Sequence, residues 1–141
     1  MSPKTAAFVF RANILLSFLA GGLLWATGAI PGFARPAEWM FDLLNWPIDG
    51  DPGSLNEAAA FMSAIGGGVL FGMGVLNWRL VAPALESGDR RILSAALASV
   101  FSWFAVDSAG SVLSGNAPNV VFNLAILALY AGPILAVRRT A

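Results

Sequence analysis

The 141-residue chain contains no cysteine and no histidine. It therefore lacks the usual ligands of zinc, iron–sulfur, blue-copper and histidine-ligated haem sites, as well as a histidine general base and a cysteine nucleophile. No glycine-rich loop followed by lysine is present to bind a phosphate. We expect neither metal nor cofactor. The one carboxyl pair that an enzyme would use is Asp107 with Glu57, and nothing in the sequence requires them to meet, so we do not expect an enzyme.

Charged residues are scarce as well. They make up 11% of the chain, against roughly a quarter in soluble domains, and 57% of the residues are apolar. This composition is typical of a protein whose solvent is the lipid bilayer. The formal net charge is zero, so no basic excess exists to attract nucleic acid.

Four apolar segments approach the ~20 residues that a helix needs to cross a bilayer. We place these helices at about 12–30, 57–78, 92–113 and 119–137. Barrel strands would alternate apolar and polar residues over ~10 positions, and these runs do not. Connections of about a dozen residues between the second and third helices, and of about five between the third and fourth, favour antiparallel neighbours. The sequence thus predicts an all-α integral membrane antiparallel four-helix bundle forming a single domain over residues 1–141.

The basic residues lie almost entirely on one side of this topology. Only Arg35 falls on the other side. Because cytoplasmic loops are enriched in lysine and arginine, we expect an integral protein of a bacterial inner membrane with both termini in the cytoplasm. The residues on the cytoplasmic side are Lys4, Arg11, Arg79, Arg90, Arg91, Arg138 and Arg139.

The first extracytoplasmic loop contains the stretch PAEWMFDLLNWP. Its spacing places Trp39, Leu43 and Trp46 on one helical face, which predicts a short amphipathic helix in the membrane interface. We favour a plain anchor, with a lid over the outer mouth of the bundle as the alternative. The following SLNE is typical of a capping box, in which Ser54 and Glu57 exchange hydrogen bonds at the start of the second helix.

Small residues repeat every four positions along the second helix. In lipid, such faces let two backbones approach closely. We expect this face to contact the first helix, which has its own small residues, and a homodimer contact is the less favoured alternative. The predicted packing residues are Ala60, Ala64, Gly68 and Gly72, beside a second row of Ala59, Ser63 and Gly67, and those of the first helix are Ser17, Gly21, Gly22 and Ala26.

Asp107 is the only acidic residue inside the third apolar segment. An acid facing lipid costs roughly 2.5–3.5 kcal/mol on insertion scales, so its helix face should point inward. Other polar residues fall at the same outer depth, and they predict an outward-opening pocket floored by Trp103. Arg35 is the one cation on this side, so it is the one candidate for an ion pair with Asp107. We expect this ion pair less than the hydrogen bonds from Ser111 and Asn123. The candidate ligand-binding residues are Thr27, Arg35, Glu57, Trp103, Asp107, Ser111, Asn119 and Asn123.

Two functions of different classes follow from this pattern. The favoured one is a non-enzymatic structural or accessory component, which assembles with a larger membrane complex or its own copies through helix packing, with Asp107 as interhelical hydrogen-bond glue. The alternative is a binding or transport module whose outer polar pocket takes a lipid or a small apolar or cationic ligand. No polar path crosses the whole bilayer, so a channel within one protomer is not expected.

Overall fold

The computed structural model describes residues 1–45, 49–51 and 53–138. Within them, four helical spans are long and apolar enough to cross a membrane, which confirms the predicted membrane helices. The first span comprises α1 (Pro3–Asn13), the π-helical η1 (Ile14–Ala20), α2 (Gly21–Ala26) and the 3-10 turn η2 (Thr27–Ala29). A separate helix, α3 (Arg35–Leu44), follows. The other spans are α4 (Glu57–Leu76) with π-helical η3 (Asn77–Val81) and α5 (Ala82–Ser87), then α6 (Arg90–Leu113), and α7 (Asn119–Arg138).

The first two spans are longer than hydropathy predicts. The first begins at Pro3 rather than near residue 12, and the second continues to Ser87 rather than ending near 78. Helical geometry continues past the apolar stretch because polar residues such as Arg79 are good helix formers. The connection from the second to the third span is consequently only Gly88 and Asp89, not a dozen residues.

Local signals set where the helices begin and end. The Asn56 side chain caps α4 by accepting a 2.8 Å hydrogen bond from the Ala59 amide. The helix does start at Glu57, but the predicted capping box with Ser54 is wrong. Asn56 takes the N-cap position instead, because asparagine is as good an N-cap as serine. Gly88, with a φ of 72°, ends α5 in a left-handed conformation that favours glycine.

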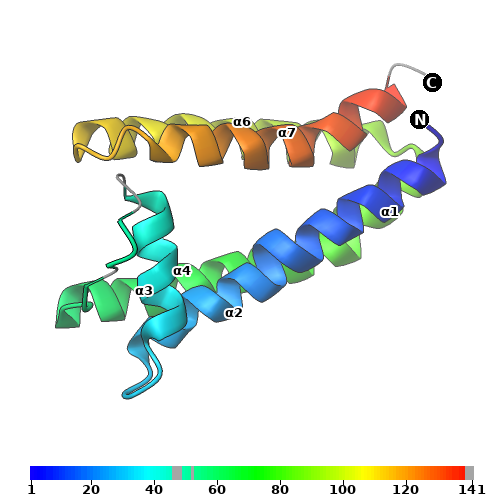
Figure 1. The fold of residues 1–141 in the computed structure, drawn as a ribbon. Coiled ribbons are helices and arrows are strands. Elements are labelled where there is room, and N and C mark those ends of the chain that lie inside the picture. The colour runs from blue at the N-terminus through cyan, green and yellow to red at the C-terminus, as the bar shows by residue number, and fades with distance from the viewer. Residues whose placement is uncertain (46–48, 52, 139–141) are drawn as a thin grey trace.

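The spans form two pairs (Figure 1). In the first pair, the span of α1 and α2 packs along that of α4 and α5, and in the second pair α6 lies beside α7. The two pairs meet through α1 against α7, and η3 and α5 against α6. They approach each other at the end that carries both termini and separate toward the other end, where α3 stands between them (Figure 1).

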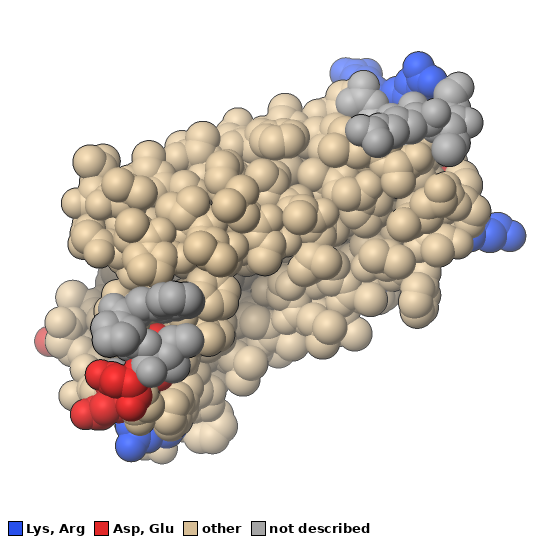
Figure 2. Space-filling model, turned by 45° about the horizontal axis from the view of Figure 1, so that its top comes forward, with Lys and Arg blue, Asp and Glu red and all other residues tan. Residues whose placement is uncertain are grey.

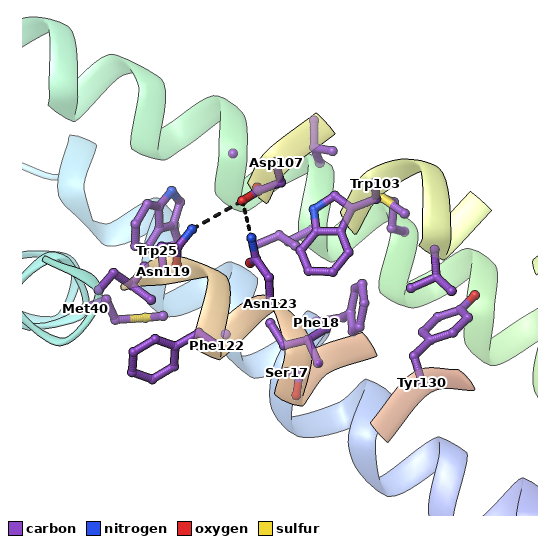
Figure 3. A pocket seen from close by; sticks show the side chains of 18 of the residues that line it. Ser17, Phe18, Trp25, Met40, Trp103, Asp107, Asn119, Phe122, Asn123 and Tyr130 are labelled. Atoms are coloured by element: carbon purple, nitrogen blue, oxygen red, sulfur yellow. Dashed lines mark hydrogen bonds between the residues drawn. The ribbon is translucent and has the colours of Figure 1, made fainter. Parts of the chain in front are cut away.

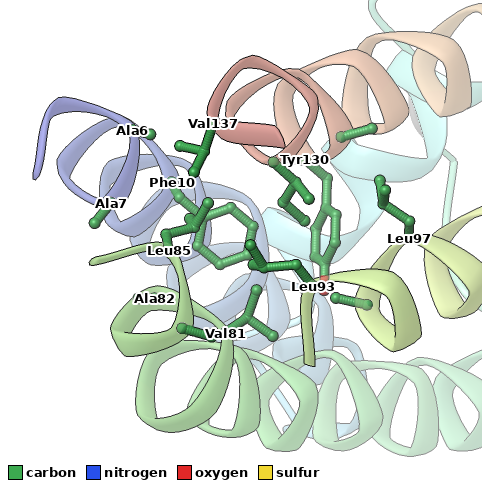
Figure 4. Packing of buried hydrophobic residues seen from close by; sticks show 14 of the residues in the cluster. Ala6, Ala7, Phe10, Val81, Ala82, Leu85, Leu93, Leu97, Tyr130 and Val137 are labelled. Carbon is green, nitrogen blue, oxygen red and sulfur yellow. The ribbon is translucent and has the colours of Figure 1, made fainter. Parts of the chain in front are cut away.

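The hydrophobic core fills the end of the molecule near the termini. Phe10, Ile14, Leu85 and Ile134 are fully buried, and side chains of all four spans interdigitate with them (Figure 4). The Phe10 and Tyr130 rings pack edge to face with centroids 5.0 Å apart. An ion pair between Arg11 and Glu86 closes this end of the first pair. The core therefore joins the two pairs at one end and leaves the other end open to separate.

The tightest backbone contact joins α2 to α4 at Gly22 and Gly67. A Cβ placed on Gly67 would lie 2.5 Å from the Gly22 carbonyl oxygen and 2.6 Å from the Ala26 nitrogen. The predicted partnership with the first helix is therefore present, but it uses the second row of small residues. Gly68 and Gly72 are exposed, and a Cβ on either would meet nothing within 4 Å. The helix is turned so that the row of Ser63, Gly67 and Gly74 is buried instead.

The outer surface is apolar between two charged ends. Many large apolar side chains point outward, with Val106 74% and Phe8 72% exposed, as expected where lipid replaces water. Most of the lysine and arginine in this view lies at the end that carries the termini, and a group of acidic residues with a basic side chain beside it occupies the opposite end (Figure 2). This distribution suits helices whose ends reach the two surfaces of a membrane.

Candidate functional site

A cavity of about 540 Å³ lies where the two pairs separate (Figure 3). Its walls come from the first, second, third and fourth spans and from α3, and most of them are apolar. Aromatic rings and methionines dominate this lining, whereas the polar groups gather near its two ends. The lining includes Phe18, Trp25, Met40, Phe41, Leu44, Met73, Trp103, Phe122, Ile126 and Tyr130, with the polar residues Ser17, Ser99, Asp107, Asn116, Asn119 and Asn123.

Asp107 of α6 is the centre of the polar end. One of its carboxyl oxygens, Oδ1, accepts hydrogen bonds from Asn123 Nδ2 at 2.7 Å and Asn119 Nδ2 at 3.2 Å, both from α7. Ser111, one turn further along α6, donates to the same oxygen at 3.4 Å. These bonds hold α6 to α7, which fits the expectation that Asp107 points into the protein and not to lipid.

Both asparagines also bind serines of α6. Asn119 Nδ2 donates to Ser111 Oγ at 2.9 Å, and Asn123 Nδ2 donates to Ser108 Oγ at 3.1 Å. Each amide nitrogen therefore has one bond to Asp107 and one to a hydroxyl. Asn123 is buried, while Asp107 and Asn119 are half-buried and face the cavity. The arrangement is a cross-linked polar wall at one end of an apolar chamber.

The α3 helix covers one side of the cavity, and its buried residues are Ala37, Glu38 and Asp42. Met40, Phe41 and Leu44 line the chamber, and the Phe41 ring lies 4.5 Å from the Trp25 ring, centroid to centroid. Trp39 and Leu43, two members of the predicted interfacial face, are exposed. Trp46, the third member of that predicted face, lies outside the described residues.

A second polar group borders the chamber at the end nearer the core. The Tyr130 hydroxyl donates to Asn77 Oδ1, and Asn77 Nδ2 in turn donates to the Met73 carbonyl oxygen at 2.9 Å. Ser17, which also lines the cavity, donates to Asn13 Oδ1 at 2.9 Å. Asn123 and Tyr130 are seven residues apart on α7, so about 10 Å of helix separates the two polar ends.

The structure brings together five of the eight predicted ligand-binding residues. Trp103, Asp107, Asn119 and Asn123 all line the cavity. Ser111 lies directly behind them, bonded to Asp107 and Asn119. The helical spacing of α6 and the short connection to α7 were sufficient to predict this cluster.

The other three predicted residues lie elsewhere. Thr27 is buried and donates to the Leu24 carbonyl oxygen at 2.6 Å, and Glu57 is exposed at the start of α4. Arg35 pairs with Glu38 at 3.2 Å and not with Asp107, because both residues belong to the first turn of α3. The expected cation beside Asp107 is therefore absent from the described residues that line the cavity.

Several lining residues were missed by the sequence analysis. Trp25, Phe122 and Tyr130 looked like ordinary membrane-helix aromatics, and Met40 and Phe41 looked like the flank of an anchor. Their one detectable signal is position, because Phe122 and Tyr130 follow Asn119 and Asn123 at helical spacing on α7. Assigning them to a cavity requires knowing that the two helix pairs separate.

The described residues contain no group of three or more acidic side chains placed to hold a metal ion. No protein family model matches this chain, and neither a curated protein nor a solved structure is detectably similar to it. The site must therefore be interpreted from its own chemistry.

Proposed function

We propose that this protein binds a small amphiphilic molecule within the membrane, in the cavity between its two helix pairs. The observation that carries this proposal is the joining of a large apolar chamber to a polar end built around Asp107. Binding sites for small molecules typically have volumes of about 300–1,000 Å³, mostly apolar walls and a few polar groups that orient the ligand. The chamber at about 540 Å³, with Asp107, Asn119 and Asn123 at one end, fits that description.

The shape of the protein supports the same function. The two helix pairs contact each other mainly near the termini, and α3 stands between them toward the other end (Figure 1). A ligand entering from the bilayer would pass between membrane-facing helices rather than through a core. In this proposal α3 acts as a lid, because Met40, Phe41 and Leu44 form one wall of the chamber.

The proposed topology is an antiparallel four-helix bundle in a bacterial inner membrane. The basic end with both termini lies in the cytoplasm, and α3 lies in the opposite interface with Trp39 toward the lipid headgroups. Support comes from the positions of seven of the eight lysines and arginines in this topology. The polar end of the cavity then lies in the outer half of the membrane.

A second candidate is the accessory role expected from the sequence. It is favoured by the exposed small-residue face of α4, where Gly68 and Gly72 have open space around them. No helix of the described chain uses this face, so a helix of a larger membrane complex or of a second copy has room to pack there. The two functions use different surfaces and can be separated by mutation.

The test is to identify what remains bound to the purified protein and to block the cavity. Gly21 has a helical φ of −59° and lines the cavity, so Gly21→Leu should fill part of the chamber. Gly72→Leu, at an open position on α4, is the matched control. We expect native mass spectrometry of protein in mild detergent to show a bound small molecule or lipid in the wild type and Gly72→Leu, and its loss in Gly21→Leu. Equal occupancy in all three proteins would contradict the proposal.

A further inference from the structure

The hydrogen-bond donors at the polar end of the cavity are already used. Asn123 Nδ2 donates both of its hydrogens, to Asp107 and to Ser108, and Asn119 Nδ2 donates to Asp107 and to Ser111. The reversed amide orientation would set each asparagine oxygen against the Asp107 carboxylate, so the network itself fixes which atom is nitrogen. The asparagines have no hydrogen left for a ligand.

The polar atoms that remain without a hydrogen-bond partner on Asp107, Asn119 and Asn123 are all acceptors. Asp107 Oδ2 and the side-chain oxygens of Asn119 and Asn123 accept no hydrogen bond from the described residues, and all three side chains line the cavity. No lysine or arginine is among the described lining residues. Together these three residues offer one carboxylate oxygen and two amide oxygens. Asn116, which also lines the cavity, is neutral, so no described lining residue would neutralise the carboxylate.

We infer that the ligand of this cavity carries a protonated amine at its polar end. An alkylammonium group is a compact cation with several N–H donors, which matches a site with several unused acceptors and one negative charge. Trp103, and Phe122 across the chamber, provide aromatic faces to which a cation is attracted. A carboxylate or phosphate would be repelled by the negative charge of Asp107, and a neutral alcohol supplies a single donor. This inference rests on the proposed function and narrows it to cationic amphiphiles.

A protonated amine in the cavity would also supply a counter-charge for Asp107. A carboxylate inside a membrane span is unfavourable unless it is paired or hydrated, and among the described residues all hydrogen-bond partners of the Asp107 carboxylate bind Oδ1. An ammonium group seated against Oδ2 would pair the charge from the cavity side. The apolar remainder of the ligand would then extend along the aromatic walls toward Tyr130.

The experiment compares four probes that share an octyl chain. Octylamine, octyltrimethylammonium, octanol and octanoate are titrated onto the protein in phosphatidylcholine nanodiscs, and tryptophan fluorescence reports on Trp25 and Trp103 in the cavity wall. Gly21→Leu nanodiscs serve as the blank for partitioning into lipid. We expect octylamine to bind at least tenfold more tightly than octanol, and octanoate to bind most weakly. Octyltrimethylammonium has the charge but no N–H donor, so it should bind more weakly than octylamine.

The variant arm uses Asp107→Asn, which keeps the side-chain shape and removes the charge. It should weaken octylamine binding at least tenfold and leave octanol binding within about twofold. The probe series on the unmodified protein is decisive even if this variant does not fold.

Octanol or octanoate binding as tightly as octylamine, with the signal abolished by Gly21→Leu, would overturn the amine assignment and leave the proposed function standing. Signals that Gly21→Leu does not change would overturn both. Equal binding of octylamine and octyltrimethylammonium would contradict the claim that the N–H groups of the amine donate hydrogen bonds to the site.

Discussion

Gly22 on α2 and Gly67 on α4 face each other backbone to backbone. A Cβ on Gly22 would lie 2.8 Å from the Gly67 carbonyl oxygen, and one on Gly67 would lie 2.5 Å from the Gly22 carbonyl oxygen. Neither position has room for a side chain, so the contact depends on two glycines meeting at one level. In lipid, where apolar surfaces gain little by meeting each other, such close approach is a main source of helix association.

Replacing Gly67 with alanine should therefore destabilise the protein. The added methyl group forces two backbones apart, and overpacking of this kind costs about 1–3 kcal/mol. Gly68→Ala is the neighbouring control, because its Cβ meets nothing within 4 Å and alanine favours the helix. Thermal unfolding in detergent measures both. An equal loss in the two variants would show that α4 is turned differently in the membrane.

The hydrogen bond from Tyr130 to Asn77 should stabilise the join between α7 and the second span. Tyr130→Phe keeps the ring that packs against Phe10 and leaves Asn77 Oδ1 buried without its donor. We expect a loss of about 1–3 kcal/mol, the usual cost of an unsatisfied buried polar group. A double-mutant cycle with Asn77→Leu checks the cause. If the hydrogen bond is responsible, the double variant should lose less stability than the sum of the two single losses. Strict additivity would exclude the bond as the source.

Asp107 should stabilise the pairing of α6 with α7 whether or not a ligand is bound. Asp107→Leu removes the acceptor of three hydrogen bonds and leaves Asn119 and Asn123 with unused donors. Asp107→Asn retains one side-chain oxygen that can accept. We expect the leucine variant to melt at a clearly lower temperature than the asparagine variant in matched detergent. A leucine variant as stable as the wild type would mean that these bonds contribute nothing to the fold.

The role of α3 as a lid can be measured by access to the cavity. Because the chain has no cysteine, Ser17→Cys places a single thiol in the lining. Phe41→Ala removes the ring packed on Trp25 and should raise the rate of labelling by N-ethylmaleimide several-fold. Trp39→Ala, on the exposed face of the same helix, should leave the rate unchanged. Similar rates in both variants would indicate that α3 is an anchor and not a lid.

The topology is tested by labelling the two ends of α6. Ser87 and Ala117 are exposed residues in or beside the connections at its two ends, and Ser87 avoids the left-handed backbone of Gly88. In sealed vesicles, a membrane-impermeant maleimide should reach Ser87→Cys only from the cytoplasmic face and Ala117→Cys only from the other face. Labelling of both from one face would contradict the four-span arrangement.

The polar end of the cavity was predictable because its signals are local. Asp107 and Ser111 are one helical turn apart, and a five-residue connection brings Asn119 and Asn123 alongside them. The chamber itself was not predictable. It exists because the two helix pairs diverge, which depends on the packing of Phe10, Leu85 and Ile134 at the far end. The sequence also could not show which small-residue row of α4 is exposed. Both rows have the same spacing, and only the packing of the helices selects between them.

The π-helical segment η1 keeps the buried residues of the first span closer to one face of the helix. Phe10, Ile14, Phe18 and Gly22 are each four residues apart and all buried. On a straight α-helix with 3.6 residues per turn, each step of four overshoots by about 40°, so the last would point about 120° away from the first. The wider turns of η1 (Ile14–Ala20) absorb part of this overshoot. Deleting one residue from η1 would rotate everything beyond it by about 100° and carry Gly22 away from Gly67. The length of this short segment, as much as the glycines themselves, determines whether the two helices can meet.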